Sequence, residues 1–384
     1  MADPKFQCRW ALLGLSSIAT TFVEDLLLRR DESDPIANKI VCVSTNGTVE
    51  RAQKWLRDCK VPNAQDVTIY KSSDEMLQKG DFDVVYISTP HPLHYQATLV
   101  ALRNGRNVLV EKPATMNRLQ FQKLADEAKK ANVVLMEAMW TRHLPAVLHL
   151  QREVLPRLGS VKRVFSDLSV PIASKDMPIT SRLLDKKAGA GALLDMGVYA
   201  LTWADIAFGG SDGAKVVFAE TIPYNTGKEP IDDINTIVLT SSDRGGAVAI
   251  VTTSLTLAGS TKSADKLAVK KVAPSVRIEG THGQVSVPFP LIRPQELQIE
   301  WYDDEHLDAS GSEAHEVVSR PVERGWGLWY QADVIARAVR DRKRGGATGP
   351  GLVIGEEESL RVLGWMDTAR QMAHITYDKE AEAV

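Results

Sequence analysis

The sequence predicts an α/β protein of two domains: a doubly wound parallel sheet, followed by an α+β domain with a large, open-faced and mainly antiparallel sheet. In the first third of the chain, short β-rich apolar runs alternate with segments of helical period, which is typical of a parallel sheet covered by helices on both faces. After about residue 140, alternating strand patterns dominate and are separated by Gly, Pro and charged loops. The expected domains are therefore residues 1–140 and 141–384.

The apolar runs of the first domain have the length and the β-branched content of strands. The segments between them carry apolar residues at helical spacing, as in the stripe of Phe22, Leu26 and Leu27. Open α/β sheets bind ligands at the carboxyl ends of their strands, so the residues that follow each strand are candidates for a site. The predicted strands are Gln7–Gly14, Lys39–Thr45, Val67–Lys71, Val84–Ser88, Asn107–Glu111 and Val133–Met136, and the predicted helices are Ile18–Arg30, Tyr95–Asn104 and Leu119–Lys130.

The second domain combines alternating strand patterns with a few longer helical segments. The loop Gly259–Lys271 is rich in Lys, Ser and Ala and is expected to be a mobile surface excursion. The predicted strands are Val161–Val170, Thr236–Thr240, Val248–Leu255, Val276–Glu279 and Leu297–Trp301, and the predicted helices are His143–Leu158, Gly191–Phe208, Gly327–Asp341 and Glu357–His374.

Length, charge and cysteine content exclude several classes of protein. With 384 residues, 44% of them hydrophobic and 25% charged, the chain suits a folded globular protein with more than one core. Its formal net charge of -3 gives no general attraction to nucleic acid or to anionic membranes. The apolar run Trp10–Leu15 is too short for a signal peptide or a membrane span. Three cysteines, Cys8, Cys42 and Cys59, fit a reducing compartment, so we expect a cytoplasmic protein.

The first strand leads into the turn Gly14-Leu15-Ser16-Ser17-Ile18-Ala19, which matches the fingerprint G-x-G-x-x-A except that a serine replaces the middle glycine. Small residues let the backbone approach a pyrophosphate, and free N–H groups at a helix N-terminus favour an anion. A serine-capped helix start explains the same residues without a ligand. The position inside a βαβ pattern favours dinucleotide binding, and hence a Rossmann domain. The expected contacts are Gly14, Ser16, Ser17, Ile18 and Ala19.

The second strand ends without the carboxylate that NAD-binding sites use to hold the ribose 2′-hydroxyl. Ser44, Thr45 and Asn46 stand there instead, and Arg51 follows one helical turn into the next element. Hydroxyl, amide and guanidinium groups suit a 2′-phosphate, so these residues favour NADP over NAD as the cofactor. Arg51 is alternatively a solvated charge on a helix.

The fourth strand is followed by Thr89, Pro90, His91 and His94, at the sheet edge where ligands bind. Each histidine can line a cofactor pocket, and each can equally cap or pack against the next helix. No cysteine or carboxylate cluster of ligand spacing accompanies them, so no metal site is expected.

The fifth strand ends in Glu111-Lys112-Pro113, which places an ammonium group at the same sheet edge. An isolated Lys-Pro is more often a surface turn. Much later, a glycine-rich run from Gly189 opens a helix on which Asp195 and Tyr199 share one face. A capping acid and a core tyrosine would explain these two residues without chemistry.

These motifs together resemble the glucose-fructose oxidoreductase / inositol dehydrogenase / MocA family. The resemblance covers nearly the whole chain. It rests on the glycine turn, on Ser88-Thr89-Pro90-x-x-x-His94, on Glu111-Lys112-Pro113, on Gly191-Ala192-Leu193-Leu194-Asp195-Met196-Gly197-Val198-Tyr199 and on Ile278-Glu279-Gly280-Thr281-x-Gly283 followed by Pro288. The stretch Met136–Arg142 and the tyrosine at position 199 resemble a branch that contains dimeric dihydrodiol dehydrogenases and NADP-dependent D-xylose 1-dehydrogenases.

The resemblance implies a Rossmann domain, an open-faced sheet domain with the substrate pocket and subunit interface, and C-terminal helices that pack back on the first domain. It assigns catalytic roles to Lys112, Asp195 and Tyr199, NADP as the cofactor, and a sugar or cyclic diol as the substrate. A homodimer through the open sheet face is expected, because that face would otherwise expose a large apolar patch. Further residues expected at the cofactor site are Glu111, Lys112, Trp140 and Arg142.

The reaction that fits best is oxidation of an aldopyranose such as D-xylose at C1 to its lactone, with hydride transfer to nicotinamide. The hydroxyl must also lose a proton, so a base is needed within about 3 Å of its oxygen. Tyr199 is the candidate, since a nearby ammonium such as Lys112 favours the phenolate, while Asp195 orients the sugar or the lysine. Lys112 or Asp195 as the base is the alternative. Other hypotheses are a trans-1,2-dihydrodiol dehydrogenase, a dicarbonyl reductase, and a non-catalytic dinucleotide-binding regulator of sugar or redox responses.

Overall fold

The computed structural model describes residues 5–28, 31, 33–173, 177–178, 181–225, 229–257, 273–302, 315–345 and 352–384. The predicted loop Gly259–Lys271 lies outside these ranges. The chain forms two compact units, and each unit has its own sheet. The first unit comprises residues 1–140, 323–356 and 384, and the second comprises residues 141–322 and 357–383.

The first unit is built on a seven-stranded sheet whose paired strands all run parallel, in the order β15-β6-β5-β4-β1-β2-β3. The order reverses between β1 and β4, so the chain winds outward in both directions, and the predicted doubly wound parallel sheet is confirmed. Its central strands are buried on both faces, which explains their continuous apolar runs. The strands are β1 (Phe6–Leu13), β2 (Ile36–Ser44), β3 (Thr68–Tyr70), β4 (Val84–Ile87), β5 (Asn107–Glu111), β6 (Leu135–Ala138) and β15 (Val353–Ile354).

Polar side chains start most helices of the first unit. Ser16, Thr48, Ser72 and Asn117 cap α1, α2, α3 and α5, and each accepts a hydrogen bond from a backbone N–H in the first turn. These caps place the start of α1 and of α2 directly after the strand ends of the sheet. The helices are α1 (Ser17–Leu26), α2 (Val49–Asp58), α3 (Ser73–Lys79), α4 (His94–Arg103), α5 (Arg118–Ala131) and α8 (Leu328–Lys343).

The second unit is built on an eight-stranded sheet in the order β14-β13-β12-β11-β7-β10-β9-β8. Among the described strands of this second sheet, β7 and β10 form the one parallel pair, and the other neighbours are antiparallel. The predicted large, mainly antiparallel sheet is therefore confirmed. The strands are β7 (Arg163–Ser169), β8 (Ala214–Tyr224), β9 (Ile231–Ser241), β10 (Ala247–Ser254), β11 (Val276–Glu279), β12 (Gly283–Val287), β13 (Glu296–Trp301) and β14 (His315–Ser319).

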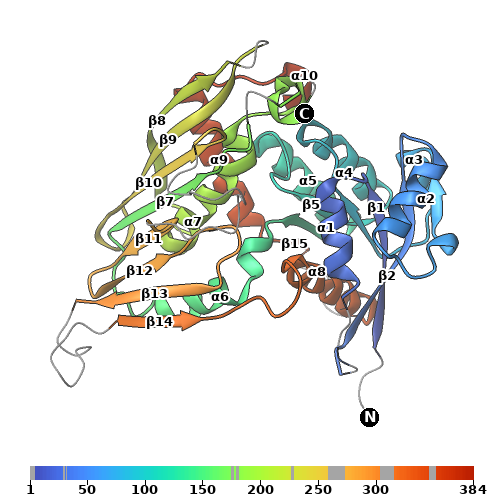
Figure 1. Ribbon diagram of the computed structural model, residues 1–384, viewed down its shortest axis with the longest axis horizontal. Coiled ribbons are helices and arrows are strands. Elements are labelled where there is room, and N and C mark those ends of the chain that lie inside the picture. The colour runs from blue at the N-terminus through green and yellow to red at the C-terminus, as the bar shows by residue number, and fades with distance from the viewer. Residues whose placement is uncertain are drawn as a thin grey trace. The chain divides into compact units, whose positions relative to one another are not determined.

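Helix α7 (Val198–Phe208) forms the buried centre of the second unit. It packs against β7 and β10 (Figure 1), and all 11 of its residues are buried. Because most residues of α7 are apolar and they lie on all sides of the helix, it is stable only inside a core. A π-helical turn, Leu193–Gly197, leads into it. The remaining helices are α6 (Pro145–His149), which continues into a π-helical turn at Leu150–Val154, α9 (Glu356–Met372) and α10 (Lys379–Glu382). No helix within the described ranges is long and apolar enough to cross a membrane.

A buried carboxylate fixes the start of α8 within the first unit. Asp25, on α1, accepts hydrogen bonds from the backbone N–H groups of Trp326, Gly327 and Leu328 at 2.8, 2.7 and 2.7 Å. The side chain is 2% exposed, and Gly325 approaches it so closely that a Cβ there would lie 2.1 Å from Oδ1. Because the first N–H groups of a helix have no intrahelical partner, Asp25 acts as a cap supplied by another helix.

We expect Asp25→Ala to lower the free energy of unfolding by about 3 kcal/mol, because the change leaves buried N–H groups without an acceptor. Urea unfolding followed by circular dichroism measures this loss. Glu24→Ala removes an exposed carboxylate from the same helix and is the control, with an expected change below about 0.5 kcal/mol. Equal stabilities of the two variants would contradict the capping role of Asp25.

Candidate active site

A cavity of about 580 Å³ lies in the first unit at the carboxyl ends of β1, β2 and β4. The strand order reverses at this point, which is where open α/β sheets bind their ligands. Most of the cofactor residues predicted after the first, second and fourth strands line this one cavity, namely Gly14, Ser16, Ser44, Thr45, Asn46, Arg51, Thr89 and Pro90. Ser17, Ile18 and Ala19 follow in the first turn of α1 and do not line it.

Ser88, at the end of β4, holds the glycine turn. The backbone at Gly14 has a φ of +100°, and a Cβ there would come within 3.0 Å of Ser88, so this position requires glycine. Ser88 Oγ donates to the carbonyl of Gly14 at 3.0 Å, and Ser16 Oγ donates to Ser88 Oγ at 3.1 Å. Ser16 Oγ also accepts from Ala19 N at 3.2 Å and thereby caps α1. The serine is therefore a helix cap and a part of the cavity wall at once.

Hydroxyl groups and a guanidinium line the cavity at the end of β2. Thr45 Oγ1 accepts a hydrogen bond from the backbone N–H group of Gly47, with a donor–acceptor distance of 3.0 Å. Thr48 Oγ1 accepts from Arg51 N at 3.2 Å, which starts α2 at a point where the Arg51 side chain reaches the cavity. Ser73 and Asp74 line the same wall and were not predicted. They follow β3, the next strand along the same sheet edge, which is the signal that points to them.

The two histidines after β4 are packed inside the first unit. The ring nitrogens of the buried His94 lie 2.8 Å from the carbonyl oxygen of Pro113 and 2.7 Å from that of Thr89. The ring of His91, also buried, meets that of His94 edge to face, with centroids 5.7 Å apart. Neither histidine lines the cavity, and His94 joins the loops that follow β4 and β5.

Two buried carboxylates hold the loop that carries Lys112. Glu111 accepts from the hydroxyl of Tyr86 at 2.6 Å and from Lys112 N at 3.2 Å. Glu137 Oε1 accepts from Ala114 N at 2.8 Å on the other side of a cis peptide bond that follows Lys112. Burial raises the pKa of Glu111. Glu111 thus fixes the backbone of Lys112 at the carboxyl end of β5, and it does not line the cavity.

Asp195 and Tyr199 lie at the start of the central helix of the second unit. Asp195 belongs to the π-helical turn, and its Oδ2 lies 3.6 Å from a guanidinium nitrogen of Arg182. Tyr199 belongs to the first turn of α7 and is 8% exposed. Asp232 Oδ2 accepts from Leu193 N at 2.7 Å and so fixes where the turn begins. Arg182 was not predicted, because it lies outside every motif in the sequence.

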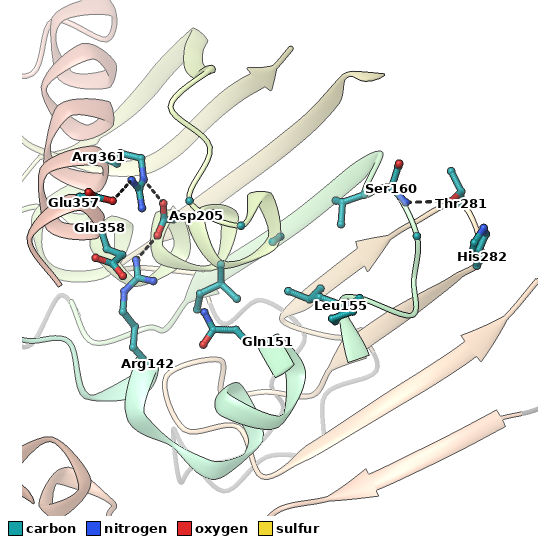
Figure 2. A pocket seen from close by; sticks show the side chains of 17 residues that line it. Arg142, Gln151, Leu155, Ser160, Asp205, Thr281, His282, Glu357, Glu358 and Arg361 are labelled. Atoms are coloured by element: carbon teal, nitrogen blue, oxygen red, sulfur yellow. Dashed lines mark hydrogen bonds and ion pairs between the residues drawn. The ribbon is translucent and has the colours of Figure 1, made fainter. Parts of the chain in front are cut away.

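Arg142, predicted at the cofactor site, lines a different cavity of about 810 Å³ within the second unit. Figure 2 shows its guanidinium directed at Asp205, which it meets at 2.7 Å, while Arg361 meets the other carboxylate oxygen at 2.8 Å. Asp205 is 2% exposed, so two guanidinium groups neutralise a buried carboxylate. Trp140 is buried in the first unit and, like Arg142, does not line the cavity of that unit.

The chemistry of the first-unit cavity suits a dinucleotide. It combines a close backbone approach at Gly14, a helix N-terminus, hydroxyl groups and a guanidinium, which are the usual partners of phosphate groups. Lys112 in the first unit supplies an ammonium group, and Asp195 and Tyr199 in the second supply a carboxylate and a phenol. The described residues contain no group of three or more His, Cys, Asp or Glu side chains that could hold a metal ion.

Two family models match the chain. The model described as "Oxidoreductase family, NAD-binding Rossmann fold" matches residues 8–139, and the GFO/IDH/MocA C-terminal domain matches residues 156–286. Together they cover most of both units and confirm the resemblance that the motifs indicated.

Individual relatives extend the match over the whole chain. D-xylose 1-dehydrogenase (NADP(+)) from Hypocrea jecorina is 30% identical, over 97% of this chain and 93% of that protein. Trans-1,2-dihydrobenzene-1,2-diol dehydrogenase from Xenopus tropicalis is 26% identical, over 96% of this chain and 99% of that protein. A solved structure of levoglucosan dehydrogenase with NADH and levoglucosan has the same fold, with a TM-score of 0.74 and 18% sequence identity. The match covers 96% of this chain and 98% of that one. The chain therefore belongs to the GFO/IDH/MocA family of oxidoreductases.

Proposed function

We propose that this protein is an NADP-dependent dehydrogenase that oxidises an aldopyranose such as D-xylose at C1 to its lactone. The observation that carries the proposal is the 30% identity, over 97% of this chain, with the D-xylose 1-dehydrogenase (NADP(+)) of Hypocrea jecorina. In this reaction the C1–H bond breaks with transfer of a hydride to nicotinamide. The C1 hydroxyl gives its proton to a base, and a C=O bond forms.

The first-unit cavity supports NADP as the cofactor. The close approach at Gly14 and the N-terminus of α1 suit a pyrophosphate. Thr45 and Arg51 would hold the 2′-phosphate, because a hydroxyl and a guanidinium both donate hydrogen bonds to phosphate oxygens. When bound, the nicotinamide accepts the hydride from the sugar.

Tyr199 is proposed to accept the proton of the sugar hydroxyl, assisted by the ammonium group of Lys112. A neighbouring ammonium favours the phenolate form that can take up this proton. Asp195 would orient the sugar by accepting hydrogen bonds from its hydroxyl groups. The hydrogen bonds that fix the backbone on both sides of Lys112 and the start of the π-helical turn support these roles, because catalytic groups need a rigid frame.

Oxidation of trans-1,2-dihydrodiols is the second candidate function. Its support is the 26% identity, over 96% of this chain, with the dihydrodiol dehydrogenase of Xenopus tropicalis. Both kinds of substrate present adjacent hydroxyl groups on a six-membered ring, so one arrangement of base and hydride acceptor could serve either.

We also propose a homodimer in a reducing cytoplasm. Val217, Phe218 and Ile222 on β8 are 45%, 48% and 59% exposed, and a second copy of the chain would cover such apolar side chains. The three cysteines are buried free thiols, and burial raises the pKa of each thiol, so none is a ready nucleophile.

A substrate panel tests the reaction. With NADP, we expect D-xylose to produce NADPH, seen at the nicotinamide absorbance band, with a higher kcat/KM than a trans-1,2-dihydrodiol. Rapid consumption of NADPH with dicarbonyls and none of NADP with sugars would assign a reductase instead. Binding of NADPH without turnover of any substrate would favour the non-catalytic regulator.

Replacing the proposed base gives a second test. We expect Tyr199→Phe to lower kcat by about a hundredfold, the usual effect of losing a general base, while the dissociation constant of NADPH is unchanged. Tyr302→Phe removes the hydroxyl of a tyrosine that is 56% exposed, and its activity should equal that of the unchanged protein. Full turnover by Tyr199→Phe would exclude the phenol as the base, and a loss confined to Lys112→Met would assign that role to the lysine.

Cofactor choice gives a third test. We expect Arg51→Ala to raise the KM for NADP by about tenfold or more and to leave the KM for NAD nearly unchanged, because a charge-assisted contact with the 2′-phosphate is lost. Arg57→Ala, an exposed position on the same helix outside the cavity, is the control. A parallel rise in both KM values would show that Arg51 does not contact the 2′-phosphate.

A further inference from the structure

His94, the first residue of α4, connects two loops of the first unit. Its Nε2 lies 2.7 Å from the carbonyl oxygen of Thr89, in the loop that follows β4 and lines the first-unit cavity. Its Nδ1 lies 2.8 Å from the carbonyl oxygen of Pro113, directly after Lys112 in the loop that follows β5. The side chain of His94 is 0% exposed, so the contacts of its two nitrogens decide how many protons the ring carries.

Both ring nitrogens of His94 face carbonyl oxygens, which only accept hydrogen bonds. A neutral imidazole donates from one nitrogen and presents a lone pair at the other, so one of these short contacts would bring a lone pair against a carbonyl oxygen. The imidazolium form donates from both nitrogens and satisfies both contacts. The geometry therefore fits a ring that carries two protons.

A buried carboxylate stands on the other side of the peptide group that His94 contacts. The carbonyl oxygen of this group, at Pro113, faces the ring, and its N–H, at Ala114, donates to Glu137 Oε1 at 2.8 Å. A positive charge at the oxygen and a negative charge at the N–H polarise the peptide group in the same sense, which strengthens both hydrogen bonds. Burial raises the pKa of Glu111, and the charge of Glu137 adds to this rise. A cation beside these two acids offsets their repulsion.

The other ionisable groups at this junction oppose a charged ring only weakly. The ends of the neighbouring elements contribute Tyr86 in β4, Lys112 after β5, Arg118 at the start of α5, the exposed acids Asp74 and Glu75 at the start of α3, and His91 just before α4. Lys112 is half-buried and Arg118 is exposed, so water screens their charges. The ring of His91 meets that of His94 edge to face, with centroids 5.7 Å apart, and a neutral His91 makes this contact without charge repulsion. One positive charge on His94 is therefore compatible with its surroundings.

We propose that His94 is a buried imidazolium that holds the loop of Lys112 to the loop that forms the wall of the proposed cofactor cavity. It is a positioning residue, because its own side chain does not line that cavity. Its effect on Lys112 and on the cofactor rests on the proposed function, whereas its charge does not depend on any reaction.

Nitrogen-15 NMR of the whole chain with labelled histidine tests the charge. At about pH 8, where a free histidine is almost wholly neutral, we expect one ring to show two protonated nitrogens. That pair of signals should disappear in His94→Gln and remain in His282→Gln, the control at an exposed histidine. A bare nitrogen at His94, or no doubly protonated ring among the eight histidines, would refute the proposal whether or not the variant folds.

Unfolding in urea at several pH values gives a measure that an uncharged histidine would not change. The unfolded chain loses the ring proton near pH 6.5 and the folded chain keeps it, so the stabilisation by the imidazolium is complete below about that pH and is lost as the pH rises. Between about pH 7 and 8, the equilibrium constant for unfolding should rise about tenfold more in the unchanged protein than in His94→Gln. Parallel pH dependence in the two proteins would overturn the proposal.

Cofactor affinity tests the positioning. We expect His94→Gln to raise the dissociation constant of NADPH by about tenfold, because the loop of Thr89 loses a charge-assisted hydrogen bond. His282→Gln should bind NADPH unchanged. Fluorescence titration measures this binding without turnover, so a failure of the dehydrogenase reaction alone leaves the test intact. Unchanged NADPH affinity in folded His94→Gln would contradict the positioning role.

Discussion

Buried carboxylates that accept backbone N–H groups fix the segments on which the proposed site depends. Glu111 and Glu137 hold the loop around Lys112 in the first unit, and Asp232 holds the turn that contains Asp195 in the second. A carboxylate binds an N–H group more strongly than a neutral acceptor does, and inside a protein no water replaces it. The side chains of the site therefore take their positions from backbone that cannot shift without breaking a hydrogen bond to a buried acidic group.

The hydrophobic pattern of the sequence predicts the fold class. Whether an individual strand can be predicted depends on how regular that pattern is within the strand. Asn107–Glu111 is buried on both faces, and its continuous apolar run predicts it with the bounds that the structure has. Strand β8 was not predicted, because irregular pairing next to Val216 and Ile222 interrupts the alternation of buried and exposed side chains. Apolar residues consequently reach its surface, where an alternating pattern would have polar ones.

Position in the sequence indicates which residues lie near a site, and tertiary contacts decide what each of them does. The residues after β1, β2 and β4 share one cavity because the carboxyl ends of parallel strands meet there. The hydroxyl of Ser16 has its partner in Ser88, 72 positions later, and Arg142 has its partner in Asp205, 63 positions later. No motif contains both members of either pair. The ion pair of Arg142 with Asp205 could not be predicted from the sequence for this reason.

The second unit is assembled from two separate stretches of the chain, residues 141–322 and 357–383. Arg142 stands near the start of the first stretch and Arg361 near the start of the second, and both bind the carboxylate of Asp205. The carboxylate of Asp205 therefore links the second stretch of the chain to the first within this unit. A fragment that ends at residue 322 would retain every strand of the sheet but would lose the ion pair between Arg361 and Asp205. A fragment that joins residue 383 directly to residue 141 would retain both ion pairs of Asp205.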